Sequence, residues 1–572
     1  MPSVTLPLVG AANRRGYKTD GNTKDQRYIG VLFHAVRNAL SGNTTVYAEK
    51  RPGWDLVSTY AGGSGLNAHA IFHSPSADKK IVLYKNTAST TYTVVYDGSS
   101  VGTFDGKSGL ISVSDVIETV ISGVTYFLWT TQGTDRGGWF FAEDASAQTS
   151  YAGDTHTNTT IDNIASTAGM YAGQAISGSG IQAGTRIASV DSGTAITTTL
   201  ATTATASGVT ITKTPIAKII DADFPSSTIS WGFSEMDGYV FAITRDGKVY
   251  NSDLNSVTSW SASGFISLNM STDDAVTIAK YKNQLLAFGD TSTEWLYNAG
   301  NPSGSPLGRT EQSFTKFGMY RKVPTDENPK ICNIGDMLFV VGQEGNSDSR
   351  GVYVLDGSRF RRVSTPNVQR AVSFWEENSV YFLATLDGFS AFGYSYLLFQ
   401  IGSDTTLLES WLYCIELDMW VESGFPYFFR MTSTGPLNAA TLNASAGKIY
   451  ELGADTNSGT TPTIKFQDEG SAYTMTIQTS PWSPQGAEGD WVFVHSVELL
   501  ADTEASGTAT LETSDDDYTT WVSRGTFDMT AQRKHIERCG AFRNSGRAFR
   551  ITHAANTGFR ARAIKVTYSV GD

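Results

Sequence analysis

The stretch Gly238-Tyr-Val-Phe-Ala-Ile-Thr-Arg-Asp-Gly-Lys-Val-Tyr250 decides the fold expected for this chain, because it contains an apolar strand, an Asp-Gly turn and a second apolar strand. Such units return at a spacing of about 40 residues, which is typical of the four-stranded blades of a β-propeller. Further copies lie at residues 284–297, 337–357, 380–388 and 411–420, and Asp387-Gly388 is expected to form the turn that ends a strand in the third of these.

A small twisted sheet cannot bury both of its faces alone, and radial stacking of several sheets supplies the missing surface. We therefore expect an all-β protein with a β-propeller of six or seven blades; a large irregular β-sandwich is the alternative. The expected divisions are an N-terminal arm or interface segment at residues 1–65, the β-propeller at residues 66–154 and 215–455, an inserted small β-domain at residues 155–214, and a C-terminal β-sandwich at residues 456–572.

Composition supports these divisions. The predicted insert is dominated by Ala, Gly, Ser and Thr, yet it keeps short apolar alternations that a disordered linker would lack. The predicted sandwich begins with the alternating stretch Trp491-Val-Phe-Val-His495. With 572 residues, 56 glycines and only 17% charged residues, the chain fits a turn-rich all-β protein.

Charge and cysteine content narrow the possible functions. A formal net charge of −13 disfavours tight wrapping of nucleic acid, because phosphate affinity comes from basic side chains, but it is compatible with a surface past which DNA slides. Cys332, Cys414 and Cys539 are far apart and lack CxxC spacing, so neither a disulfide framework nor a zinc site is expected. The first ten residues do not resemble a signal peptide, and we expect a soluble protein.

Sequence motifs of catalysis are missing: there is no Walker loop, no GxSxG and no HExxH. His69 and His73 form the only close histidine pair, and a structural role is favoured over metal binding because no third ligand lies nearby in sequence. The segment 514–521 resembles the Asp box of sialidase propellers with Tyr518 in place of Gly, and we interpret it as a hairpin turn stabilised by Asp side chains. We expect no enzyme, no catalytic residue, no metal and no cofactor.

Two basic stretches are candidates for contacts with other molecules. One lies near the N-terminus, and the other runs from residue 532 to residue 562 with Glu537 as its only acidic residue. Strand residues alternate faces, so the arginines at 547 and 550 should point in opposite directions, which favours a protein interface over a continuous DNA-binding stripe. The candidates for subunit or DNA contacts are Arg14, Arg15, Arg51, Arg533, Lys534, Arg538, Arg543, Arg547 and Arg550.

Several short motifs occur in one order along the chain. They are Leu6-Pro-Leu8, Arg51-Pro-Gly53 after Val36-Arg-Asn38, the central blades, and a C-terminal part with Ser514-Asp-Asp, Trp521, Arg538-Cys-Gly540 and Arg547-Ala-Phe-Arg550. Together they resemble the tail hub or nozzle proteins of short-tailed bacteriophages, also called packaged-DNA stabilisation proteins. The predicted insert departs from the simplest members of that family.

The resemblance implies a structural protein of the virion tail that forms a homo-oligomeric ring, a homohexamer, below the portal and adaptor proteins. This tail nozzle would retain packaged double-stranded DNA, conduct it during ejection, and hold tail fibres or spikes. The alternative function is a glycan-binding or glycan-hydrolysing propeller, similar to a sialidase, in a receptor-binding tail component; a generic propeller scaffold is a third possibility.

Overall fold

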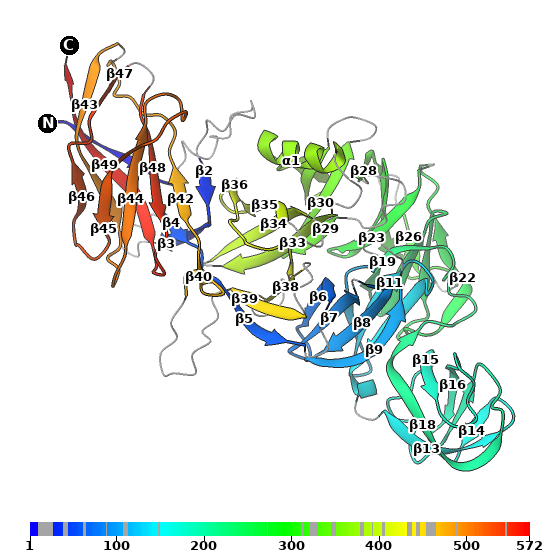
Figure 1. The fold of residues 1–572 in the computed structure, drawn as a ribbon. Helices are drawn as coiled ribbons and strands as arrows, with labels where there is room; N and C mark the ends of the chain where they lie inside the picture. Colours follow the sequence, from blue (N-terminus) through cyan, green and yellow to red (C-terminus); the bar gives the residue numbers. More distant parts are fainter. Residues whose placement is uncertain are drawn as a thin grey trace. The chain divides into compact units, whose positions relative to one another are not determined.

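The computed structural model describes residues 1–9, 27–37, 44–60, 65–86, 88–106, 113–146, 149–271, 273–301, 303–309, 314–320, 330–344, 350–377, 383–391, 393–402, 407–431, 438–441, 447–452, 465–487, 489–543 and 546–571. These residues fold almost entirely into β-strands, with α1 (Pro366–Glu377) as the one α-helix among them (Figure 1). The predicted all-β fold is confirmed. The chain divides into unit 1, which comprises Met1–Ser58, Arg362–Ala439 and Lys448–Asp572, and unit 2, which comprises Thr59–Arg361 and Ala440–Gly447.

Unit 2 contains a succession of antiparallel sheets in which most strands pair with their sequence neighbours. The first sheet has the order β6 (Leu66–Ser74), β7 (Lys79–Asn86), β8 (Thr91–Tyr96), β9 (Ser99–Asp105). The next is β10 (Ile117–Ile121), β11 (Val124–Thr131), β12 (Gly137–Ala142) and β18 (Thr205–Lys218). The third sheet has the order β19 (Ile229–Met236), β20 (Tyr239–Thr244), β21 (Lys248–Ser252), β22 (Trp260–Ser267). The fourth has the order β23 (Ala275–Tyr281), β24 (Gln284–Gly289), β25 (Thr293–Asn298), β26 (Leu307–Gly308). The fifth has the order β28 (Phe317–Met319), β30 (Met337–Glu344), β31 (Gly351–Asp356), β32 (Arg359–Arg362), and β29 (Ile331–Ile334) also pairs with β30.

Successive sheets of unit 2 stack on one another through apolar side chains. Phe241 and Val249 of the β19–β22 sheet share a buried cluster with Leu285 and Leu296 of the following sheet. That following sheet packs in turn against the β28–β32 sheet through a second cluster, which contains Leu286, Phe288, Trp295, Phe317, Leu338 and Tyr353. Such stacking is the arrangement that lets small blades bury both faces.

Two-residue turns explain why the hairpins of unit 2 form where they do. Asp237 and Gly238 connect β19 to β20 with φ angles of 53° and 81°, and Asp97 and Gly98 connect β8 to β9 with φ angles of 47° and 78°. Positive φ at both turn residues matches the twist of the flanking strands, and Asp-Gly tolerates it well. The Asp-Gly pairs therefore fix these strand ends locally.

One expected turn is wrong. Residues Asp387 and Gly388 lie inside the continuous strand β33 (Leu383–Ala391), where they pair with Leu398 and Leu397 of β34 (Tyr394–Gly402). Asp387 is buried and faces Arg430 at 3.4 Å, so a charge partner stabilises a residue type that is otherwise rare in strand interiors.

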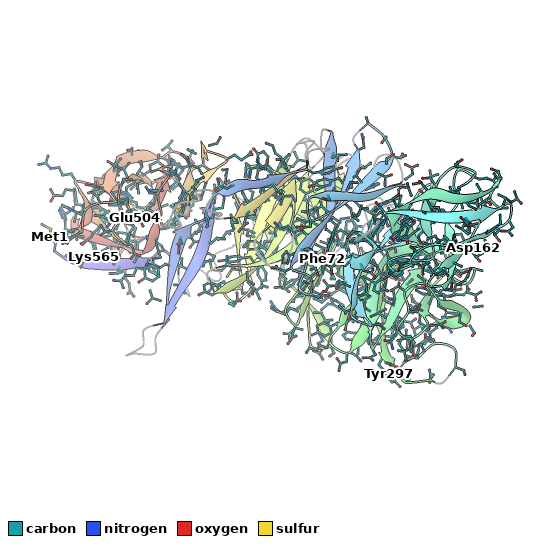
Figure 2. The ribbon with its side chains drawn as sticks, turned by 90° about the horizontal axis from the view of Figure 1, so that it is seen from below. Met1, Phe72, Asp162, Tyr297, Glu504 and Lys565 are labelled. Atoms are coloured by element: carbon teal, nitrogen blue, oxygen red, sulfur yellow. The ribbon has the colours of Figure 1, made fainter. Side chains whose placement is uncertain are left out.

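The predicted small β-domain is present in unit 2 as an insert between β12 and the end of β18. Its strands are β13 (Ser150–His156), β14 (Thr160–Asp162), β15 (Gln174–Ser177), β16 (Ile187–Ser192) and β17 (Ala195–Thr198), with β18 running from the insert into the blade (Figure 1). Its own core contains Ile161, Ile176, Ile187, Ile196 and Ile211. Figure 2 labels Asp162 on this insert.

Unit 1 contains further propeller-type strands and a sandwich. β33, β34, β35 (Leu407–Cys414) and β36 (Met419–Glu422) pair in order, and a four-stranded sheet has the order β37 (Phe429–Met431), β38 (Asn438–Thr441), β39 (Lys448–Leu452), β5 (Trp54–Thr59). One sandwich sheet contains β42 (Met475–Gln478), β48 (Ala548–His553), β44 (Thr508–Ser514) and β45 (Val522–Asp528), which are linked to β36 by β2 (Arg27–Ile29). The other contains β3 (Val31–Arg37), β4 (Thr44–Lys50), β49 (Arg560–Gly571), β43 (Trp491–Ala501) and β46 (Lys534–Glu537), with β1 (Ser3–Pro7) and β47 (Ala541–Arg543).

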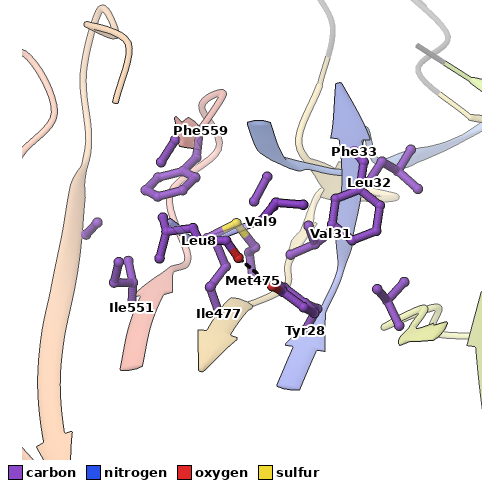
Figure 3. Packing of buried hydrophobic residues seen from close by; sticks show 14 of the residues in the cluster. Leu8, Val9, Tyr28, Val31, Leu32, Phe33, Met475, Ile477, Ile551 and Phe559 are labelled. Carbon is purple, nitrogen blue, oxygen red and sulfur yellow. Dashed lines mark hydrogen bonds between the residues drawn. The ribbon is translucent and has the colours of Figure 1, made fainter. Parts of the chain in front are cut away.

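The two ends of the sequence build this sandwich together. β1 pairs with β49 from Ser3 opposite Thr567 to Pro7 opposite Ala563. In Figure 3 the side chains of Leu8 and Tyr28 pack among residues of the C-terminal strands such as Ile477, and the Tyr28 hydroxyl donates a hydrogen bond to the Leu8 carbonyl oxygen. The predicted boundaries at residues 65 and 456 stay predictions, whereas unit 1 joins the first 58 residues with the C-terminal strands.

Candidate interaction surface

Arg51, one of the predicted contact residues, is fully buried within unit 1. Its guanidinium donates hydrogen bonds to the two Asp468 carboxylate oxygens at 2.8 and 2.6 Å and to the carbonyl oxygens of Ser423 and Gly424. The guanidinium carbon also lies 3.9 Å from the centre of the Tyr473 ring. Arg51 therefore connects three distant segments of unit 1, and its side chain is not exposed for contact with another molecule.

Arg547 is another buried arginine of unit 1 that pairs with a carboxylate. Its side chain is fully buried, and it donates two hydrogen bonds to the Asp515 carboxylate, both at 2.7 Å. It also donates to the carbonyl oxygens of Cys539 at 2.7 Å and Ala541 at 2.9 Å. This bidentate pair holds the loop after β44 against the segment between β46 and β47.

The loop between β44 and β45 is the turn expected from the segment 514–521. Asp516 accepts hydrogen bonds from the Thr520 backbone amide at 2.9 Å, the Thr520 hydroxyl at 2.5 Å and the Ser514 hydroxyl at 2.8 Å. These bonds, of which those from Thr520 are the largest cause, lower the pKa of Asp516 to about 2. The predicted structural turn is confirmed.

Lys534 and Arg550 are also held by neighbours in the sandwich. Lys534 is almost fully buried, and its ammonium donates to the Ala531 carbonyl oxygen at 2.8 Å. Arg550 is partly exposed, pairs with Glu512 at 2.7 Å and stacks over Trp521 at 4.1 Å from the ring centre.

Among the predicted contact residues of the basic run, Arg533, Arg538 and Arg543 are exposed. Arg533 lies 3.4 Å from the Glu498 carboxylate, and Arg543 donates to the Gly489 carbonyl oxygen at 2.6 Å. Arg14 and Arg15 lie outside the described residues. Of the described candidates, these three arginines are the ones whose side chains are well exposed on the surface, and their contacts with other molecules stay a prediction.

Two exposed aromatic side chains lie on β43, the strand that pairs with Arg543. Trp491 and Phe493 are 43% and 44% exposed, although the residues between and after them on β43, Val492 and Val494, are buried. On β47, Arg543 is paired directly with Trp491, and its guanidinium carbon lies 6.0 Å from the tryptophan ring centre. We name Trp491, Phe493 and Arg543 the aromatic patch.

The aromatic patch has the residue types that are common at protein interfaces. Tryptophan and arginine are enriched among the residues that dominate binding energy at protein interfaces, and contiguous exposed apolar patches are common at interaction sites. The sequence predicted Trp491-Val-Phe-Val only as a strand of the sandwich. The sequence does contain a sign of an exposed apolar surface. Successive residues of a strand point to opposite faces, so a run of consecutive apolar residues makes both faces apolar.

A buried basic cluster lies near the N-terminal strands of unit 1. The Lys50 ammonium is buried and donates to the Ala555 carbonyl oxygen at 2.7 Å, and burial, together with the charge of Arg51, lowers its pKa to about 8. Burial, followed by the nearby Lys50 charge, lowers the pKa of His553 to about 4. The neutral form of His553 is therefore favoured in the folded state.

The two histidines of the predicted pair, His69 and His73, each contact a neighbouring side chain. His69 is buried on β6 with its ring edge-on to Tyr92, and His73 lies 3.1 Å from Asp78. Across the described ranges, no three His, Cys, Asp or Glu side chains are grouped so that they could hold a metal ion. The described residues contain no helix of the length and apolar character needed to cross a membrane.

The stacked antiparallel sheets define a β-propeller protein with an inserted β-domain and a C-terminal sandwich, as predicted. The chain belongs to the phage stabilisation family, whose model, described as Bacteriophage P22 Gp10, beta-propeller, matches residues 111–407. The protein is therefore a bacteriophage tail protein, and the resemblance seen in the sequence is confirmed. No curated protein sequence matches the chain.

Solved structures give only weak similarity. The Pan2 WD40 domain of Neurospora crassa is 8% identical with a TM-score of 0.31, covering 71% of this chain and 95% of its own. The computationally designed Ika8 protein is 11% identical with a TM-score of 0.31, covering 69% and 99%. A glycoside hydrolase is 12% identical with a TM-score of 0.23, covering 79% and 98%. Scores this low carry no argument about fold or function.

Proposed function

We propose that this protein forms the nozzle or hub ring of a short-tailed bacteriophage, retains packaged DNA and conducts it during ejection, without doing chemistry. Membership of the phage stabilisation family carries this proposal, since the matched region includes β10 through β34 with the insert. The net charge of −13 supports a conduit role, because an acidic wall makes few favourable phosphate contacts that would hold a moving duplex.

The aromatic patch supports assembly with protein partners. In a closed ring, one surface of each subunit meets a different surface of its neighbour, and portal or adaptor proteins and tail fibres or spikes are the other proposed partners. A partly exposed tryptophan and phenylalanine beside basic side chains suit a partner surface with apolar and acidic groups. Localisation in the virion tail and a hexameric ring belong to the same proposal.

A complementation experiment tests the ring together with two exposed arginines, Arg543 of the aromatic patch and Arg538 outside it. The double variant Arg538→Glu and Arg543→Glu reverses two exposed charges and leaves the buried Arg547 pair intact, so the monomer should fold while incorporation into tails fails. The matched control, Arg359→Glu with Arg361→Glu, reverses two exposed charges on β32 in unit 2 and should incorporate.

Genome retention is measured in the same particles by protection of DNA from added nuclease. Particles without the protein should lose their DNA after packaging. If such particles keep their genomes, the DNA-retaining function is wrong, and if the Arg538/Arg543 double variant assembles like the wild type, the interface assignment is wrong.

A further inference from the structure

A pocket of 580 Å³ lies between the insert and the neighbouring blade of unit 2. Three segments supply its walls: the loop before β15, strand β16 with Thr199, and the residues after β18 together with the turn before β22. Its volume falls in the range of roughly 300–1,000 Å³ that is usual for small-molecule sites. The lining residues are Met170, Tyr171, Ala172, Ala188, Ser189, Val190, Thr199, Ile220, Asp221, Thr258 and Ser259.

The wall formed by Tyr171 is fixed by the adjoining blade. Its hydroxyl donates to the Asp144 carboxylate, with distances of 2.7 and 2.8 Å to the two oxygens, and its backbone amide donates to the Gln174 side-chain oxygen at 2.9 Å. The ring stands edge-on to Tyr126 and Phe140. Tyr171 therefore has little freedom to move when a ligand enters.

Beside the pocket, the side chain of Arg186 connects the insert to the blade. Arg186, just before β16, donates to the Gly173 carbonyl oxygen at 2.8 Å and lies 5.2 Å from the ring centre of Trp139 on β12. Gly173 itself approaches the backbone of Lys218 so closely that a Cβ there would lie 1.8 Å from the Lys218 carbonyl oxygen. The β16 wall is thus held in place, and the pocket is preformed.

The lining combines hydroxyl groups, one carboxylate and apolar surface. Ser189, Thr199, Thr258 and Ser259 line the pocket with hydroxyl groups. The Ser189 and Ser259 hydroxyls donate to Asp191 at 2.6 Å and to Asp253 at 2.5 Å, so each can still accept a hydrogen bond. The Thr199 hydroxyl accepts the Arg186 backbone amide at 2.9 Å and can still donate. The Asp221 carboxylate accepts the Trp260 and Asp223 backbone amides at 3.2 and 2.9 Å, which leaves each oxygen a further lone pair.

The charges of the lining residues argue against an anionic ligand. None of the eleven lining side chains is Lys, Arg or His, and Asp221 contributes a negative charge. The nearby Arg186 guanidinium is not part of the lining and contacts the Gly173 carbonyl oxygen and the Trp139 ring. An anionic ligand such as a phosphate or an acidic sugar would therefore meet the like charge of Asp221 with no cationic side chain in the lining. A purely apolar ligand would leave unused the acceptor positions that remain on Asp221, Ser189 and Ser259.

We propose that this pocket binds a neutral saccharide, with sugar hydroxyls bonded to Asp221 and the Ser and Thr side chains, and sugar C–H faces against the apolar wall of Met170, Val190 and Ile220. A polyhydroxylated ring that carries no charge matches each part of the lining. This binding site goes beyond the proposed tail function and does not depend on ring assembly.

The test uses the full chain and an array of neutral oligosaccharides together with their sialylated and uronic-acid counterparts, followed by titration calorimetry on the neutral sugars that bind. The variant Ser189→Trp fills the pocket from an exposed strand position and should weaken binding by about tenfold or more. The matched control Thr210→Trp places the same side chain at an exposed position of β18 outside the lining and should bind like the wild type.

A second variant, Asp221→Asn, keeps the size of the side chain, removes the charge and should weaken binding as well. Unchanged thermal unfolding of each variant shows that the insert remains folded. The proposal is overturned if the wild type binds none of the neutral sugars, if it prefers the acidic counterparts, or if Ser189→Trp and Asp221→Asn both leave the affinity unchanged.

Discussion

The blades of unit 2 and the sandwich of unit 1 differ in where their strands come from. In the blades, partners are close in sequence, as at Met236 opposite Tyr239, and a two-residue turn fixes the register. In the sandwich, Ser3 lies opposite Thr567, so no turn can fix the register. The difference teaches that the blades are encoded locally, whereas the sandwich forms only when distant segments meet. Because contacts between distant segments slow folding in general, we expect the sandwich to form after the blades.

Breaking the buried ion pair between Arg51 and Asp468 should give the largest difference in stability between the two units. Arg51→Ala leaves the buried Asp468 carboxylate without its charge partner, so we expect the free energy of unfolding of unit 1 to fall by roughly 3–5 kcal/mol. Denaturant unfolding followed by tryptophan fluorescence should show an earlier transition for unit 1 and an unchanged one for unit 2. Arg533→Ala, at an exposed pair, is the control and should stay within about 0.5 kcal/mol of the wild type. A small loss in Arg51→Ala would show that the pair does not hold the segments together.

Two leucine truncations compare the units directly. Leu8 in unit 1 and Leu286 in unit 2 are both fully buried, and replacing either with Ala should cost about 2–5 kcal/mol through lost burial and a cavity. We expect Leu8→Ala to destabilise only unit 1 and Leu286→Ala only unit 2, as measured by hydrogen exchange of each unit. If Leu8→Ala leaves the C-terminal strands fully protected, the N-terminal segment is not part of their core.

Protonation of His553 at acidic pH should lower the stability of unit 1 by a smaller amount. Because His553 has a folded-state pKa of about 4, below its ordinary value of 6.5, the unfolded state binds more protons as the pH falls through this window. Its contribution to stability is therefore complete above pH 6.5 and is lost between pH 6.5 and 4, by up to about 3 kcal/mol. His553→Phe should flatten this part of the stability curve for unit 1. An unchanged pH profile in that variant would assign the dependence to other groups.

Particular residues show how far the sequence could predict the site. The turn at Asp516 was predicted correctly because its bonds lie within a few residues. Arg51 and Arg547 were predicted to face other molecules, but each has a carboxylate partner far along the chain that sequence spacing does not reveal. The exposure of Trp491 was not predicted, because an apolar residue on a strand is more often buried.

The sequence by itself determined the all-β class, the propeller-type blades and the small inserted domain, because hairpin turns and apolar alternation act over a few residues. It also determined the family. Only the tertiary structure decided that Asp387 and Gly388 lie within a strand, that the first 58 residues join the C-terminal strands, and that a pocket forms where the insert meets a blade. Each of these depends on contacts between segments far apart in the chain, and local propensity contains no information about such contacts.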